Sequence, residues 1–118
     1  MATPRLRVEL DIFSGRPNPS WVLDVAEEQA LLAHLRLGAG CEPRSDGLGY
    51  RGFLVRRMDM SAAAGPWLRV GHGVVMLSGP RAVAHRDAGR LEEHLIGQAV
   101  AHGFGPLVGV PSPTREDS

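Results

Sequence analysis

Hydrophobic and polar residues alternate most regularly near the start of the chain, over residues 5–13. Apolar side chains take every second position, at Leu6, Val8, Leu10 and Ile12, and charged side chains fill the positions between them. A period of two places successive side chains on opposite faces of a strand. The segment therefore predicts a strand with one buried and one solvated face.

Two later segments, residues 48–58 and 67–77, are also rich in apolar side chains and are predicted to be strands. The loop of about eight residues between them favours an antiparallel hairpin. Gly49 and Gly52 in the first segment, and the two glycines that flank His72 in the second, indicate a bulge or a close approach of another backbone.

Two segments have the apolar spacing of amphipathic helices, namely residues 25–37 and 88–102. Asp24 precedes the first and has Glu27 three residues later, which is the pattern of a capping box. Asp87 is the predicted cap of the second helix.

These elements predict an α+β fold with the order β-α-β-β-α, in which a mostly antiparallel sheet and two helices form a small two-layer sandwich. One domain is expected over residues 1–110, followed by a disordered tail over residues 111–118. Because a three-stranded sheet leaves two strand edges open, we also expect a homodimer.

Composition narrows the class of protein further. All 13 basic residues are arginines and are balanced by 13 acidic residues in 118, so the sequence predicts neither a nucleic-acid nor a membrane partner. Cys41 is the only cysteine, which excludes an internal disulfide. The chain has no apolar segment of ~20 residues and no signal-peptide core, so a soluble cytoplasmic protein is expected.

The loop over residues 14–20 contains two prolines, which restrict the backbone and make the loop stiff. One interpretation is a binding site for a small anionic ligand or a protein segment. The candidate binding residues are Ser14, Arg16, Asn18, Trp21, Tyr50 and Arg51. The alternative is a structural corner, in which Arg16 pairs with Asp11 or Glu27, Asn18 caps local backbone groups and Trp21 anchors the core.

The nine residues from Phe13 to Trp21 read F-S-G-R-P-N-P-S-W. With L-G-Y-R-G-F over residues 48–53, this stretch resembles a family of small uncharacterised proteins from bacteria and some fungi that carry an F-S-G-R-P-N-P-x-W motif. The resemblance covers most of residues 6–100 and supports a single domain. It implies no activity.

Motifs of known chemistry are absent. The five histidines lack the close spacing of a zinc site, and no Walker loop, G-x-G-x-x-G or G-x-S-x-G motif is present, so no metal or cofactor is expected. Arg51, Arg56 and Arg57 are interpreted as one solvated strand face. The favoured function is a non-catalytic binding or accessory domain. The alternative is a small enzyme that uses Asp11, His72 and Arg16.

Overall fold

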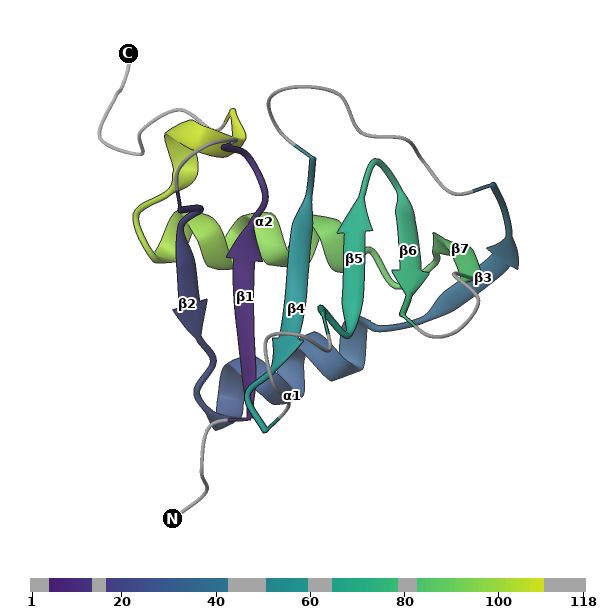
Figure 1. Cartoon of the computed structure of the whole chain (residues 1–118), viewed down its shortest axis with the longest axis horizontal. Helices are drawn as coiled ribbons and strands as arrows, with labels where there is room; N and C mark the ends of the chain where they lie inside the picture. The colour runs from purple at the N-terminus through teal and green to yellow at the C-terminus, as the bar shows by residue number, and fades with distance from the viewer. Residues whose placement is uncertain (1–4, 14–16, 43–50, 60–64, 79–82, 110–118) are drawn as a thin grey trace.

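The computed structural model describes residues 5–13, 17–42, 51–59, 65–78 and 83–109 of the chain. Within these ranges, seven strands form one sheet, accompanied by two α-helices and a short 3₁₀ helix (Figure 1). The strands are β1 (Leu6–Leu10), β2 (Ser20–Val22), β3 (Leu37–Gly40), β4 (Phe53–Arg57), β5 (Leu68–Gly71), β6 (Val74–Leu77) and β7 (Val83–Asp87). The helices are α1 (Val25–His34), α2 (Leu91–Ala101) and the 3₁₀ helix η2 (Gly105–Val108).

The strands follow the order β2-β1-β4-β5-β6-β7-β3 across the sheet, and every neighbouring pair is antiparallel. Strands β4 to β7 form a meander, because each pairs with the next strand in the sequence. Helix α1 carries the chain from β2 at one edge of the sheet to β3 at the opposite edge. The two edge strands are therefore the two that flank α1 in the sequence.

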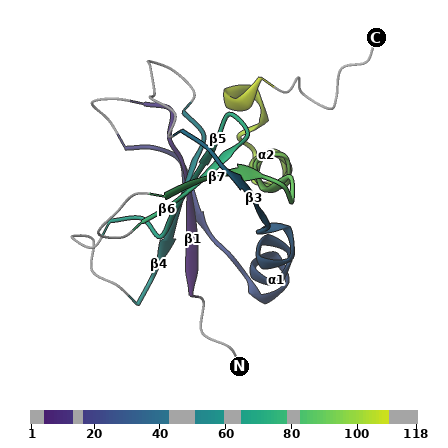
Figure 2. The same cartoon turned by 90° about the vertical axis from the view of Figure 1, so that its right-hand side faces the viewer.

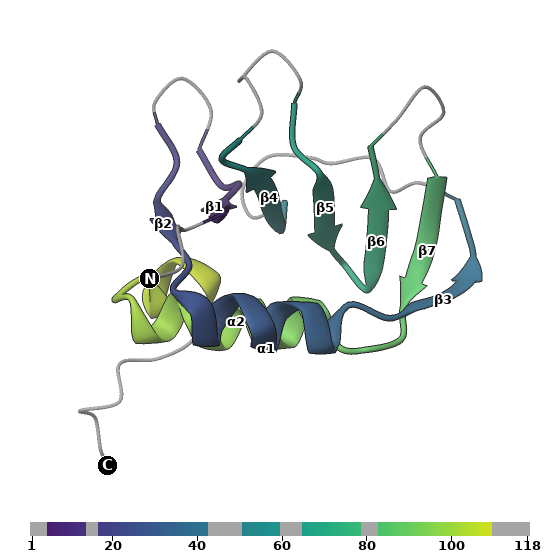
Figure 3. The ribbon, with the colours of Figure 1, turned by 90° about the horizontal axis from the view of Figure 1, so that it is seen from below.

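Both α-helices lie on the same face of the sheet (Figure 2 and Figure 3). The alternation along β1 turns Leu6, Val8 and Leu10 toward this face, where each is 5% exposed or less. The side chains join one apolar cluster with residues of both helices. The helical members are Leu31, Leu91, Leu95 and Ala99. The one-sided burial predicted for the first strand is confirmed.

The predicted α+β sandwich of order β-α-β-β-α is wrong, because the sheet has seven strands where three were expected. Strands β2, β3 and β7 were not indicated by the sequence pattern. Strand β2 has only three residues, and β3 reads Leu-Gly-Ala-Gly, so neither shows an alternation long enough to recognise. These segments are extended because they pair with a neighbouring strand. The strand propensity of their own side chains does not account for it.

Residues 67–77, predicted as one strand, contain the antiparallel hairpin of β5 and β6. His72 and Gly73 form its two-residue turn, with φ angles of 53° and 78°. Two consecutive residues with positive φ are typical of a type I′ turn, whose twist matches that of the flanking strands. Gly73 therefore marks a chain reversal instead of the predicted bulge. At Gly71 the predicted close approach of another backbone is confirmed, because a Cβ there would lie 2.9 Å from the carbonyl oxygen of Arg51.

Both predicted helices are present, and an acidic side chain bonds to the first turn of each. Asp24 accepts the backbone N–H of Glu27, and the Glu27 carboxylate accepts the backbone N–H of Asp24, which confirms the capping box. Helix α1 ends at His34, three residues earlier than expected. Helix α2 begins three residues later than expected and its N-cap is Arg90, so the prediction of Asp87 as the N-cap is wrong. The carboxylate of Asp87 still accepts the first two N–H groups of α2 from the preceding turn.

The predicted tail of residues 111–118 lies outside the described residues. No helix in the described ranges is long and apolar enough to cross a membrane.

Val8 tests the assignment of the two faces, because its side chain is fully buried between β2 and β4. We expect Val8→Asp to unfold the protein, since burying an unpaired carboxylate costs several kcal/mol against a total stability of about 5–15 kcal/mol. The exposed neighbour Arg7 should tolerate Arg7→Gln within about 0.5 kcal/mol. Thermal denaturation measures both variants, and equal Tm values would show that the faces are reversed.

Candidate binding site

The sheet face turned away from the helices carries charged side chains from three adjacent strands. Alternation along β1 places Arg7, Glu9 and Asp11 on this face, opposite the buried leucines and valine. Arg56 of β4 lies directly across from Arg7, and Arg69 of β5 lies on the same face one strand further. We call these five residues the open-face cluster.

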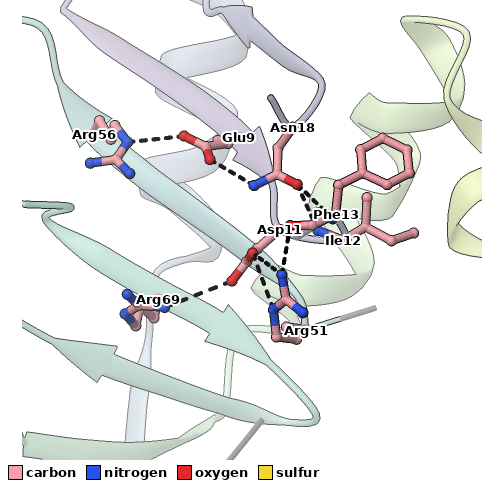
Figure 4. A network of polar contacts seen from close by, with 8 residues as sticks. All are labelled: Glu9, Asp11, Ile12, Phe13, Asn18, Arg51, Arg56 and Arg69. Atoms are coloured by element: carbon pink, nitrogen blue, oxygen red, sulfur yellow. Dashed lines mark hydrogen bonds and ion pairs between the residues drawn. The ribbon is translucent and has the colours of Figure 1, made fainter. Parts of the chain in front are cut away.

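Ion pairs connect the acidic members of the cluster to arginines of other strands (Figure 4). Arg56 Nε donates to Glu9 Oε1 at 3.0 Å. The Asp11 carboxylate lies between two guanidinium groups: Arg51 Nη2 is 3.0 Å from Oδ1, and Arg69 Nη1 is 3.8 Å from Oδ2. Both carboxylates of the cluster are therefore already paired.

A β-bulge brings Arg51 to this face. The backbone of Asp11 donates its N–H to Gly52 and accepts the N–H of Arg51, so two residues of the β4 segment face one residue of the β1 segment. Strict alternation from the buried Phe53 would turn Arg51 toward the core, and the extra residue turns it to Asp11 instead. Gly52 has a φ of 96°, and a Cβ there would lie 2.1 Å from the carbonyl oxygen of Val70. The position therefore requires glycine.

The side chain of Asn18 links the loop to β1 (Figure 4). Its Oδ1 accepts the backbone N–H groups of Ile12 at 3.1 Å and Phe13 at 2.7 Å. Its Nδ2 donates to Glu9 Oε2 at 2.9 Å. Asn18 thus uses both ends of its amide inside the protein, as the interpretation as a structural corner predicts for this residue.

Trp21 points to the opposite face of the sheet and belongs to the core, where it is 6% exposed. Its indole stacks on Phe104 and His102 and meets Phe53 edge to face. Its Nε1 donates to Gln98 Oε1 at 3.0 Å. A tryptophan held on every side in this way anchors β2 to α2 and leaves no open ring face for a ligand.

Of the six predicted binding residues, the structure brings Asn18 and Arg51 together around β1 and places Trp21 on the other face. Ser14, Arg16 and Tyr50 lie outside the described residues. The two carboxylates suggested as partners of Arg16 have other partners, because Asp11 binds two arginines and Glu27 binds His102. Ligand binding by the six residues stays a prediction.

The cluster also contains residues that sequence reasoning did not select, namely Arg7, Arg56 and Arg69. Their alternation with apolar residues indicates the solvent face of a strand, but nothing in the sequence shows that β1 pairs with β4. The interpretation of Arg51 as part of a solvated strand face is wrong, because its side chain is only 16% exposed and is paired.

Of the residues suggested for catalysis, Asp11 and His72 lie in the described ranges and Arg16 lies outside them. Asp11 is held by arginines, and His72 is exposed on the turn between β5 and β6. A cavity of about 150 Å³ lies at the other end of β1, lined by Arg5, Leu6, Glu28, Leu32, Arg57 and Trp67. In the described ranges, no three His, Cys, Asp or Glu side chains gather in an arrangement that would hold a metal ion.

No family model matches this sequence, and no curated protein or solved structure matches it significantly. The resemblance carried by Phe13 to Trp21 therefore stays a prediction.

Arg51 and Arg57 provide a matched test of the bulge, because both lie in or beside β4 and both pair with an aspartate. The Arg51–Asp11 side chains are 16% and 13% exposed, whereas the Arg57–Asp59 side chains are 52% and 63% exposed. We expect Arg51→Ala to lower stability by roughly 3 kcal/mol, because it leaves a carboxylate partly buried without its main partner. Arg57→Ala should cost less than about 1 kcal/mol.

Thermal denaturation at neutral pH measures the difference. On a protein of this size the loss for Arg51→Ala corresponds to a decrease in Tm of more than about ten degrees. Similar Tm values for the two variants would contradict a structural role for the Asp11–Arg51 pair.

Proposed function

We propose that this protein is a non-catalytic binding domain of the cytoplasm that holds an anionic ligand on the open face of its sheet. The ligand is a small oxyanion or an acidic segment of another protein, and Asn18 of the stiff loop over residues 14–21 bonds to Glu9 on this face. The carrying observation is the placement of Arg7 directly opposite Arg56 on adjacent strands.

Like charges directly across from each other destabilise a pair of strands. Glu9 compensates Arg56, but Arg7 makes no ion pair with any residue that the structure describes. With Arg51 and Arg69 included, four guanidinium groups share the two carboxylates of Glu9 and Asp11 on this face. A bound anion would relieve this excess of positive charge.

Arginine suits this task because its planar fork of N–H donors matches the oxygens of a phosphate or carboxylate. The strands also hold the forks in place. Arg56 is fixed at Nε by Glu9, and Glu9 is fixed in turn by Asn18. The hydrogen bonds of Asn18 therefore support binding indirectly, because Asn18 positions Glu9 and Glu9 positions Arg56.

The alternative, a small enzyme, has less support. Its proposed acid–base group, Asp11, is engaged by Arg51 and Arg69, and the cavity near Trp67 contains neither Asp11 nor His72. Binding of single-stranded nucleic acid also has little support, because the described aromatic residues of β2 and β4, Trp21 and Phe53, face the core and are not available for stacking on bases.

Isotope-labelled protein titrated with inorganic phosphate, and separately with a poly-glutamate peptide, tests the proposal. We expect NMR shift changes to concentrate on β1, β4 and β5 for at least one of the two anions. Arg7→Gln should weaken that binding about tenfold, which corresponds to about 1.4 kcal/mol and to one charge-assisted hydrogen bond. Because Arg7 is exposed, the variant should keep the wild-type fold.

Arg36→Gln is the matched control, since Arg36 is an exposed arginine at the junction of α1 and β3, far from the cluster along the sheet. Its binding should equal that of the wild type. Arg16→Ala in the same series measures the part played by the loop. Equal weakening by Arg7→Gln and Arg36→Gln, or tighter binding of an oligonucleotide than of either anion, would contradict the proposal.

We further expect a homodimer formed through a sheet edge. Ser20 and Val22 of β2 turn their backbone polar groups away from β1, because the hydrogen bonds to β1 come from the flanking positions. Val22 is also an exposed apolar residue at this edge. Light scattering at micromolar concentration should give twice the 12.7 kDa of one chain. A mass of 12.7 kDa would remove the dimer.

A further inference from the structure

Two histidines stack between the α-helices, on the side of the sheet away from the open-face cluster. The rings of His34 in α1 and His94 in α2 have centroids 4.4 Å apart and planes 16° apart. His34 Nδ1 lies 2.8 Å from the carbonyl oxygen of Gly89, which can only accept. His34 therefore carries a proton on Nδ1 and donates it to the segment that leads into α2.

The protonation state of His94 follows from its other neighbours. The indole Nε1 of Trp21 is only a donor, so its bond fixes the side-chain oxygen of Gln98 toward Trp21. The amide nitrogen of Gln98 then faces His94 Nε2 at 3.1 Å. Since that nitrogen is also only a donor, His94 Nε2 must accept. The structure therefore requires a neutral His94 with its proton on Nδ1.

We propose that His94 is a proton-sensitive latch: the neutral imidazole holds α1, α2 and β2 together, and protonation releases them. A proton on Nε2 would place two donors against each other, His94 and the Gln98 amide. Rotating the Gln98 amide by 180° would satisfy His94 but would turn its NH₂ group toward the indole N–H of Trp21. No orientation of Gln98 satisfies both neighbours, so the chain Trp21–Gln98–His94 closes only around a neutral ring.

Some of the charged and titratable groups around His94 raise its pKa and others lower it. Helix α1 contributes His34 and Glu27, and the carboxylate of Glu27 lies 2.9 Å from His102 Nε2. Strand β5 turns Arg69 to the opposite face, and η2 contains no titratable residue. On its own helix, Arg90 stands one turn before His94 and pairs with Glu93. Burial lowers the pKa of His94, His34 lowers it further, and Glu27 raises it.

The direction of the pH dependence follows from the lowered pKa. The unfolded chain takes up the His94 proton near pH 6.5, at a higher pH than the folded protein does. Stability is therefore complete above about pH 6.5 and decreases as the pH falls below that value toward the pKa of the folded state. Carboxylates of ordinary pKa titrate mainly below this window.

Thermal denaturation at pH 7.5 and pH 5.0 measures the latch in the whole chain. The wild-type Tm should decrease by about 5 °C on acidification, the shift that a loss of about 1 kcal/mol produces on a domain of this size. His94→Gln keeps an acceptor for the Gln98 amide but cannot titrate, so its Tm should change by less than about 2 °C. His72→Asn, on the exposed β5–β6 turn, should behave like the wild type, because asparagine tolerates positive φ.

Gln98→Glu should reverse the direction in which the His94 pKa is shifted. A carboxylate at this position can accept from Trp21 and from a protonated His94 together, so the His94 ring signals in an NMR titration should move to a pKa above the ordinary value of 6.5. In the wild type the same signals should titrate below it. A wild-type His94 that titrates at or above 6.5, or an acid-induced loss of Tm that persists in His94→Gln, would overturn the proposal. The wild-type titration decides the question even if a variant does not fold.

Discussion

Two short helices cover only one face of a seven-stranded sheet, and this one-sided cover is the constraint on which the other features depend. It requires β1 to turn its apolar side chains toward the helices and its charged side chains away from them. The polar groups of β1 must then find partners on neighbouring strands. The bulge at Gly52 provides one partner, because it turns Arg51 from the core side to Asp11. The charged face is thus a consequence of where the helices lie.

The sequence predicted those parts of the fold that carry a local signal of sufficient length. The alternation along β1 and the capping box of Asp24 are present as expected, because backbone geometry and hydrogen bonding within a few residues determine them. Strand β3, with two glycines in four residues, exists because β7 offers it backbone partners. Long-range pairing of this kind leaves little trace in the local pattern, which is why three strands were expected where seven are found.

The candidate site was predictable to a smaller extent. Asn18 was predicted as a candidate because it lies in a stiff loop. Its bonds to Ile12 and Phe13 agree with the local capping expected of asparagine. The arginines at positions 7 and 56 lie 49 residues apart in the sequence, and only the register of β1 against β4 brings them face to face. The contact between His34 and His94 could likewise not be predicted from the sequence. The spacing of histidines along one helix does not show which residues of two helices meet.

The position of α1 has a consequence for how the protein unfolds. Its N-terminal end continues from β2 and its C-terminal end leads into β3, so a single helix is covalently joined to both margins of the sheet. Detaching α1 removes support from strands that lie at opposite ends of the strand order. Fraying of one edge strand is therefore linked to fraying of the other. We therefore expect β2, β3 and α1 to unfold as one cooperative unit, whereas the meander of β4 to β7 between them is held by contacts that are local in the sequence.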